Sequence, residues 1–226
     1  MQDWFYDDLR QVGLDFEDEG EVETYDARQG GSAAKDAVLL DRLGVGPATA
    51  MADIGCGTGI MACQAAAMGA RVQAVDVSKT MLRAVEQRAC ESGVALRLQH
   101  AGFLTFEASG LDLVTSKFAL HHLPDFWKAA ALVRIYDALK PGGRLYIEDV
   151  VFNCAPAAIA ATVEAWVDYM TAQTGYTRDD VACHVRDEHS TFGWVLERLI
   201  AEAGFTMLQA SYEEPVYATY LAERPA

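Results

Sequence analysis

Three glycines alternate directly behind a short apolar run that ends in an acid, in the stretch Met51-Ala-Asp-Ile-Gly-Cys-Gly-Thr-Gly59. The mostly apolar residues 49–54 predict a buried strand, and the small apolar residues after Thr58 predict a helix. Glycine between a strand and a helix lets the backbone turn tightly and lets a ligand touch it without an intervening Cβ. The stretch therefore predicts a nucleotide-type binding loop.

The spacing of the glycines separates three kinds of nucleotide-type loop. A dinucleotide fingerprint, Gly-x-Gly-x-x-Gly, would place its last glycine at the position of Ile60. A phosphate-binding P-loop ends in Gly-Lys-Ser or Gly-Lys-Thr, and no lysine lies between Lys35 and Lys79. The remaining pattern, Asp-x-Gly-x-Gly-x-Gly, resembles motif I of the class I S-adenosylmethionine (SAM) dependent methyltransferases. The resemblance implies that this loop holds the methionine tail and ribose of SAM, through Asp53, Gly55, Cys56, Gly57 and Gly59.

An acid also ends the second predicted strand, residues 71–76, and Asp76 lies 17 residues (76 − 59) after Gly59. A carboxylate at the tip of this strand in a doubly wound sheet can accept hydrogen bonds from both ribose hydroxyls. Taken alone, Asp76 is equally well explained as a helix cap before Ser78, which itself is the expected N-cap of the next helix. The resemblance adds Val77 and Met81 as adenine-side contacts, although Met81 also fits a core position.

The loop after the third predicted strand, residues 95–99, departs from the family pattern. Many members of the family carry an acid there that bonds the adenine amino group, whereas this chain has Gly102. The departure leaves the adenine contact to the backbone or to Phe103.

The stretch Lys117-Phe-Ala-Leu-His-His-Leu-Pro124 follows the fourth predicted strand, residues 111–116. It is similar to the family's wall between cofactor and acceptor, which implies Lys117 as a cofactor contact. Methyltransferases that act on nucleic acids or protein amides usually carry Asn/Asp-Pro-Pro-Tyr here, and its absence argues against those substrates. His121 and His122 diverge by about 100° on a helix, so we expect only one to face the pocket. Either can serve as a base, because histidine is readily neutral at pH 7.

Lys140-Pro-Gly-Gly143 matches the family's turn before the fifth strand, which we expect at residues 144–147, ending at Glu148 and Asp149. Open parallel sheets bind ligands beyond the carboxyl ends of their strands, so an acid there lies near the pocket floor. Glu148 is the catalytic candidate, with a solvated strand end as the alternative.

The acidic balance narrows the class of substrate. The 226 residues hold 33 acidic and 18 basic side chains, a net charge of −15. Non-specific nucleic-acid binding and binding to anionic membranes both need basic patches, so a neutral or cationic small molecule fits better. Five cysteines without a Cys-x-x-Cys pair indicate a reducing compartment, and the N-terminus shows no signal-peptide pattern. We therefore expect a cytoplasmic monomer or homodimer without nucleic-acid or membrane partners.

Residues 1–23 combine nine acids and one base with interleaved aromatic side chains, which is too aromatic for a disordered tail. We expect one helix and then a loop through Tyr25 and Asp26, so that residues 1–32 form a lid over the cofactor mouth. The resemblance makes Tyr25 a contact for the carboxylate end of the cofactor, with plain packing as the alternative. Tyr6 is a candidate substrate contact in the same segment.

Residues 150–192 lie where this family varies the cover of its substrate pocket. A helix is expected over residues 157–174, followed by a polar cluster with four candidate substrate contacts: His184, Arg186, Glu188 and His189. Alternatively, this cluster caps the amphipathic helix that starts near Trp194, through Ser190 or Thr191. A metal held by His184, His189 and Glu188 is not expected, because the spacing is unspecific and methyl transfer needs no metal.

These features predict an α/β fold and a single domain, residues 1–226. The resemblance implies that its core is a doubly wound, mostly parallel seven-stranded sheet of order 3-2-1-4-5-7-6 with an antiparallel last strand. The resemblance implies SAM as cofactor and in-line displacement of its methyl group onto a small-molecule acceptor, whose reacting atom no motif encodes. Two other functions stay open: a SAM-dependent enzyme that transfers a different group, and a SAM-binding regulatory protein without catalysis, which Gly102 favours.

Overall fold

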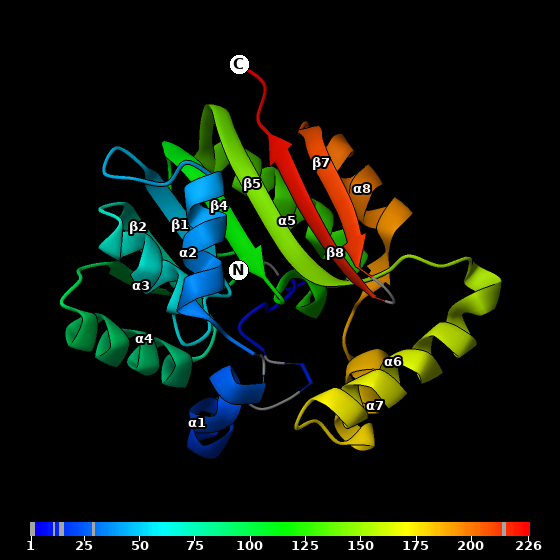
Figure 1. The fold of residues 1–226 in the computed structure, drawn as a ribbon. Helices are drawn as coiled ribbons and strands as arrows, with labels where there is room; N and C mark the ends of the chain where they lie inside the picture. The colour runs from blue at the N-terminus through cyan, green and yellow to red at the C-terminus, as the bar shows by residue number, and fades with distance from the viewer. Residues whose placement is uncertain (1–2, 11, 14–15, 29, 214–215) are drawn as a thin grey trace.

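The computed structural model describes residues 3–10, 12–13, 16–28, 30–213 and 216–226, and it centres on a twisted sheet (Figure 1). The strand order is β3-β2-β1-β4-β5-β8-β7; β1 to β5 pair in parallel, and β8 is antiparallel to both β5 and β7. The strands are β1 Ala50–Ile54, β2 Arg71–Asp76, β3 Arg97–His100, β4 Leu111–Lys117, β5 Leu139–Phe152, β7 Thr206–Glu213 and β8 Tyr217–Glu223. The short β6, Thr191–Phe192, pairs in parallel with the end of β5. The order confirms the expected topology, since β7 and β8 are the sixth and seventh expected strands.

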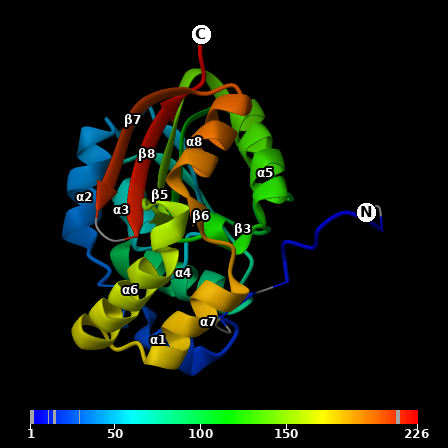
Figure 2. The ribbon, with the colours of Figure 1, turned by 90° about the vertical axis from the view of Figure 1, so that its right-hand side faces the viewer.

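Helices cover both faces of the sheet (Figures 1 and 2). One face carries α2 (Ala33–Arg42), α3 (Ile60–Ala67) and α4 (Lys79–Ser92), and the other carries α5 (Asp125–Ala138) and α8 (Gly193–Glu202). Strand β1 is buried along its whole length, because parallel strands in this arrangement lie between two helical layers. Within the described part of the chain, no helix is both long and apolar enough to cross a membrane.

The remaining helices lie beyond the carboxyl ends of the parallel strands. These are α1 (Glu19–Arg28), α6 (Ile159–Gln173) and α7 (Arg178–Asp187), with the 3-10 turns η1 (Leu120–His122) and η2 (Pro156–Ala158). Figures 1 and 2 show α1, α6 and α7 together below the sheet. A small apolar cluster that includes Trp166 and Val181 packs α6 and α7 against the end of β5. The polar ends of β1, β4 and β5 are therefore covered rather than open to solvent.

Local signals explain how α4 begins and ends. The hydroxyl of Ser78 accepts a hydrogen bond from the amide of Met81 (3.0 Å), which confirms the expected N-cap. Gly93 ends the helix with φ +66°, a conformation that favours glycine.

Two expectations about local structure were wrong. Tyr25 lies within helix α1 rather than in a loop, because the Asp18 carboxylate accepts a hydrogen bond from the amide of Glu21 (3.0 Å) and starts a helix there. Strand β5 runs without a break from Leu139 to Phe152, so it starts before the expected turn and continues past Glu148. The turn is an irregularity inside the strand, where Gly142 has φ +77° and the register with β4 shifts.

Candidate functional site

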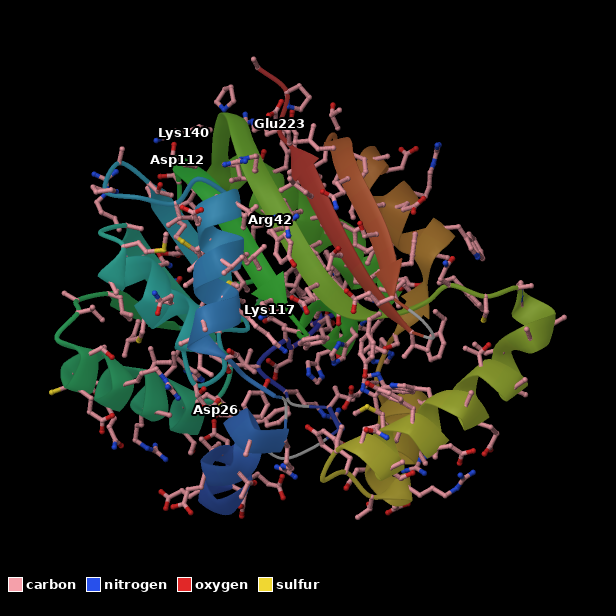
Figure 3. All side chains as sticks on the ribbon, viewed as in Figure 1. Asp26, Arg42, Asp112, Lys117, Lys140 and Glu223 are labelled. Atoms are coloured by element: carbon pink, nitrogen blue, oxygen red, sulfur yellow. The ribbon has the colours of Figure 1, made fainter. Side chains whose placement is uncertain are left out.

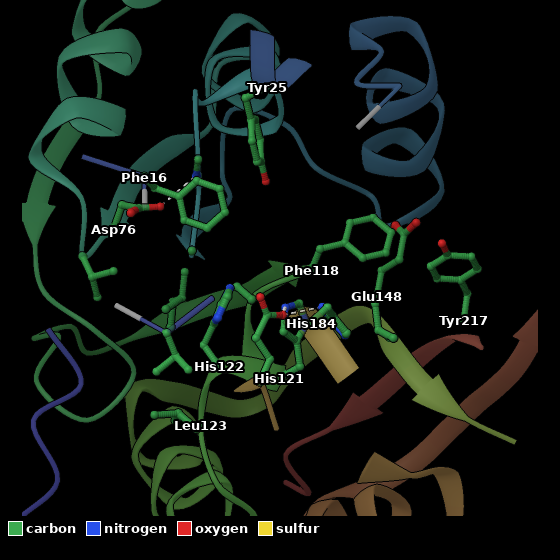
Figure 4. A pocket seen from close by; sticks show the side chains of 18 of the residues that line it. Phe16, Tyr25, Asp76, Phe118, His121, His122, Leu123, Glu148, His184 and Tyr217 are labelled. Atoms are coloured by element: carbon green, nitrogen blue, oxygen red, sulfur yellow. Dashed lines mark hydrogen bonds and ion pairs between the residues drawn. The ribbon is translucent and has the colours of Figure 1, made fainter. Parts of the chain in front are cut away.

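A cavity of about 470 Å³ lies at the carboxyl ends of the central strands, under α1, α6 and α7 (Figure 4). Its size is that of a small-molecule site. Of the residues singled out from the sequence, those that line the cavity are Tyr6, Tyr25, Gly55, Gly57, Asp76, Val77, Met81, Gly102, Phe103, His121, His122, Glu148, His184 and Glu188. The cavity therefore joins the glycine loop to the two histidines and to the helical cover.

The glycine loop follows β1 and brings bare backbone to the cavity wall. The amides of Gly55 and Cys56 donate to the carbonyl of Val75 (2.9 and 3.1 Å), which ties the loop to β2. Gly55 has φ +72°, and a Cβ on it would lie 2.2 Å from the Cβ of Ala119. At Gly57, a Cβ would reach to 3.3 Å from the Tyr25 ring, so α1 closes directly over this loop.

Asp76 ends β2 and faces the cavity, where Figure 4 shows it near Phe16. One carboxylate oxygen accepts from the amide of Gly57 (2.9 Å) and the other from the amide of Ser78 (2.8 Å). A carboxylate offers about four lone-pair sites, so each oxygen keeps one for a ligand. Burial raises the pKa of Asp76 to about 6.

Other predicted cofactor contacts lie behind the cavity wall. Asp53 is buried and accepts a hydrogen bond from the hydroxyl of Thr115 (2.7 Å), which links β1 to β4, and burial raises its pKa to about 6. Cys56 keeps its thiol beside the carbonyl of Gly57 (3.7 Å). Gly59 packs against Val85, where it starts α3. These residues shape the loop from behind.

Lys117 also lies behind the wall, at the end of β4. Its ammonium donates to Asp36 (2.7 Å) and lies 3.7 Å from the carboxylate of Glu148. Figure 3 shows Lys117 near the cavity end of the sheet, whereas Lys140 and Asp112 pair at the opposite end. Lys117 thus neutralises acids beside the cavity.

Beside Gly102, a buried acid lines the cavity that sequence reasoning missed. Asp8 accepts from the amide of Leu104 (2.6 Å) and the hydroxyl of Thr105 (3.3 Å), although it lies almost a hundred residues away in sequence. A Cβ on Gly102 would lie only 2.2 Å from the Asp8 Oδ2. Burial raises the pKa of the Asp8 carboxyl. The Asp8 carboxylate thus fills the space that a side chain at position 102 would need. In the sequence, the glycine at this position was the signal that another group lies there.

His121 and His122 both line the cavity, although we expected only one to face it. They sit on the 3-10 turn η1, and their rings are 4.4 Å apart. The cavity wraps around this turn, so side chains that diverge still reach it. The Phe16 ring packs edge-on to His122 on one side, and the His184 ring lies against His121 on the other.

The two histidines have opposite electrostatic surroundings. Burial lowers the pKa of His121, but Asp149 and Glu188 more than offset this and raise it to about 9. Its Nδ1 contacts the Asp149 carboxylate, and its backbone amide donates to the same side chain (3.0 Å). No carboxylate of the described residues pairs with His122, and burial together with His121 lowers its pKa to about 3. His121 is therefore charged at neutral pH and His122 is neutral.

Glu148 lines the cavity at the pocket floor, as expected from its place on β5. It lies 3.4 Å from the hydroxyl of Tyr146, and burial raises its pKa. Tyr6 reaches the cavity from the N-terminal segment and packs against Trp127, with ring centroids 6.0 Å apart.

Only some of the four candidate substrate contacts in the helical cover reach the cavity. His184 and Glu188 are mostly buried and line the cavity from the end of α7. Arg186 points to solvent with 63% of its side chain exposed and pairs with Asp187. The His189 ring is not among the cavity-lining groups; instead, its backbone amide donates to the carbonyl of His121 (2.8 Å). The structure thus brings two of the four to the site.

The capping alternative for this cluster is wrong. Helix α8 begins after Phe192 without a side-chain cap. The Ser190 hydroxyl is 2.8 Å from Nε2 of His184, and the Thr191 hydroxyl donates to Asp125 (2.9 Å). Tertiary partners therefore take both hydroxyls.

Four aromatic residues complete the acceptor side and were not singled out from the sequence: Phe118, Trp166, Tyr176 and Tyr217. Phe118 has φ +51°, a strained conformation for a side chain of this size. The Trp166 indole donates to the hydroxyl of Tyr217 (3.1 Å). Aromatic surface beside the polar side chains of His121, His184 and Glu188 suits a small organic ligand.

Comparison with known proteins agrees with this geometry. Residues 51–143 match the family described as a methyltransferase domain. The chain carries a class I SAM-dependent methyltransferase domain. Over 115 residues it is 36% identical to a ubiquinone biosynthesis O-methyltransferase of Xanthomonas axonopodis pv. citri (strain 306). That alignment covers 49% of this chain and 46% of the relative, so the chain spans about half the length of the curated relatives it matches.

Solved structures share the fold of the methyltransferase domain. A SAM-dependent methyltransferase from Aquifex aeolicus superposes with a TM-score of 0.67 at 14% identity, covering 92% of this chain and 98% of its own. A second, from Clostridium acetobutylicum ATCC 824, gives 0.69 at 13% identity with the same coverage. At such low identity, the likeness concerns the fold alone.

The methyltransferase domain fits its cofactor, SAM. Gly55 and Gly57 present bare backbone, and Asp76 keeps one lone pair on each oxygen for a diol. Val77, Met81 and Phe103 supply apolar surface beyond Asp76, as a purine requires.

Proposed function

We propose that the protein transfers the methyl group of SAM to a small-molecule acceptor. One observation carries the proposal: a single cavity runs from the glycine loop and Asp76 to a second compartment built by His121, His184 and Glu188. A cofactor at the first end and an acceptor at the second would meet beside η1. The O-methyltransferase relatives favour an oxygen acceptor, and the net charge of −15 supports a small molecule over a nucleic acid.

The cofactor is placed by backbone and by two acids. Asp76 accepts the two ribose hydroxyls, and the backbone at Gly55 and Gly57 holds the methionine end under Tyr25. Asp8 accepts the adenine amino group, because it is the carboxylate at the apolar end of the cavity, where Phe103 lies. Asp8 of the N-terminal segment thereby replaces the acid that many members of the family carry at the position of Gly102.

Alignment and exclusion of water supply most of the rate enhancement. The sulfonium of bound SAM makes the methyl group electrophilic, so an acceptor held in line with it takes the methyl and S-adenosylhomocysteine leaves. The proton that a hydroxyl acceptor loses goes to Glu148 or to the neutral His122, which both line the cavity. The aromatic wall and the N-terminal segment exclude water. Glu188 and His184 hold the acceptor by hydrogen bonds, and Asp149 fixes the orientation of His121. We also infer residues 1–32 to be a lid, since Asp26 contacts both Thr58 and Arg88 beside the glycine loop.

The two other functions are less well supported. Gly102 had favoured a regulatory protein that lost catalysis, but Asp8 occupies the space left by the missing side chain. The mass of the product distinguishes methylation from the transfer of a different group. All five cysteines are free, which supports our inference of a reducing compartment such as the cytoplasm.

Calorimetric titration with SAM tests the cofactor site. Asp76→Ala removes two charge-assisted hydrogen bonds and should weaken binding by ~100-fold or more. Asp76→Asn keeps the size of the side chain and should weaken it less. Asp41→Ala removes the same charge from the exposed face of α2 and should bind SAM like the native protein. Unchanged affinity in Asp76→Ala would sink the ribose assignment.

A further inference from the structure

We propose that His121, His184 and Glu188 form a binding site for one divalent metal ion of the zinc class, at the acceptor end of the cavity. The three side chains come from two separate elements, η1 and the end of α7. Each offers one ligand atom, and these atoms all lie within 4.8 Å of one another. All three are mostly buried, and all line the cavity.

The three ligand atoms lie close enough together to share one ion. Nε2 of His121 lies 3.2 Å from Oε2 of Glu188, and Nδ1 of His184 contacts the same oxygen. Both imidazole nitrogens therefore converge on one buried carboxylate oxygen. Ligands about 2.1 Å from a tetrahedral zinc ion are roughly 3.4 Å apart and aim their lone pairs at the ion, not at each other. Small side-chain shifts would close the widest pair to that separation.

Each imidazole is oriented from behind, as metal-binding histidines usually are. The Asp149 carboxylate contacts Nδ1 of His121 and leaves Nε2 for the ion. The hydroxyl of Ser190 lies 2.8 Å from Nε2 of His184 and leaves Nδ1 for the ion. The edge of the buried Trp166 ring shields His184, with ring centroids 5.1 Å apart. The same nitrogens that face the common point are therefore the ones left free.

Charge favours a dication at this point. Asp149 and Glu188 place two negative charges around His121 in a buried region, and a single positive charge on that imidazole compensates only one of them. A dication in place of the His121 proton compensates both. Two nitrogen ligands and one carboxylate suit zinc-class ions, whereas magnesium and calcium prefer oxygen ligands alone. Three protein ligands leave a fourth position open toward the cavity, as in catalytic zinc sites.

The sequence concealed this site because it pairs residues from different elements. His184 and Glu188 are four residues apart and share one side at the end of α7, but the third ligand lies 63 residues (184 − 121) earlier. A metal at this position would coordinate an acceptor hydroxyl and lower its pKa, which makes the oxygen a better nucleophile. This role rests on the proposed methyl transfer, whereas the binding of the metal does not.

Metal analysis of the intact protein tests the site. The protein is stripped with a chelator, reloaded with Zn²⁺ or Co²⁺, and analysed by mass spectrometry for metal content and by calorimetry for affinity. We expect one ion per chain in the native protein, and loss of binding by ~100-fold or more in His184→Ala and in Glu188→Gln. Asp149→Asn should weaken binding by ~10–100-fold. His189→Gln removes a neighbouring histidine outside the triad and should keep one ion.

Two further readouts keep the result unambiguous. The cobalt protein should show visible absorption without a thiolate charge-transfer band, which excludes binding at the free cysteines. Circular dichroism identifies any variant that fails to fold. Because His184 and Glu188 are changed in separate variants, one folded variant is enough to test the site. An unchanged ion count in both folded variants, or no ion in the native protein, would overturn the proposal. Titration with SAM on the same samples shows separately whether the cofactor site works.

Discussion

The contact between Asp8 and Gly102 gives a sharp test of how the adenine end is built. A methyl group at position 102 would lie 2.2 Å from Oδ2 and 2.5 Å from Cγ of Asp8, so Gly102→Ala forces one of them to move. Overpacking of this kind costs about 1–3 kcal/mol. Asp8→Ala leaves the buried amide of Leu104 without its acceptor, which costs about 1–3 kcal/mol as well.

The double variant Asp8→Ala/Gly102→Ala shows whether the two single variants are destabilised by the same contact or by two independent effects. Without the Asp8 carboxylate, the nearest Asp8 atom to the new methyl is its Cβ at 3.1 Å, a contact that a shift of a few tenths of an ångström relieves. We therefore expect the free energy of unfolding in urea to fall by at least ~1 kcal/mol less than the sum of the single variants. An additive result, or an unchanged stability in Gly102→Ala, would refute the placement of Asp8.

Three further predictions concern the rest of the site. In the presence of a chelator, raising the pH should destabilise the protein, because the pKa of His121 is raised from 6.5 to about 9. The ion pair of the charged imidazole stabilises the fold by roughly 3 kcal/mol below pH 6.5, and this stabilisation is lost as the pH rises through 9. Urea unfolding across this range should show the loss, and His121→Gln should abolish it. Tyr25→Ala should weaken SAM binding by ~10-fold in calorimetry through lost packing on Gly57, whereas Tyr25→Phe should not; equal losses would contradict the lid contact. Ser78→Ala should lower the free energy of unfolding by ~1 kcal/mol, since α4 loses its N-cap; no change would count against that cap.

The glycine loop and Asp76 could be predicted because both depend on local pattern. A buried strand, a glycine turn and an acid at the next strand end are all visible within about thirty residues of sequence. The strand order followed from the resemblance of these motifs to a known family, not from local pattern. We expected Tyr25 in a loop after an N-terminal helix, whereas the Asp18 cap starts a helix that includes it. Helix starts of this kind depend on a single hydrogen bond.

The acceptor end could not be predicted, because its contacts join elements that are distant along the chain. Asp149 of β5 contacts His121 of η1, and Glu188 reaches His121 and His184 from the end of α7. His184 was paired with His189 by sequence proximity, but their side chains take different directions. Asp8 shows the same limit beside Gly102: it lines the cavity, but nothing in its local sequence distinguishes it from the other acids of the N-terminal stretch.

The most direct test of methyl transfer uses SAM labelled with a trideuterated methyl group. The native protein is incubated with labelled SAM and a small-molecule cell extract, and the metabolites are compared by mass spectrometry with those from Asp76→Ala. The account predicts a metabolite that gains one trideuterated methyl in place of hydrogen, with matching formation of S-adenosylhomocysteine, and far less of it with Asp76→Ala. SAM binding without any labelled product, or a product carrying a different group from SAM, would contradict it.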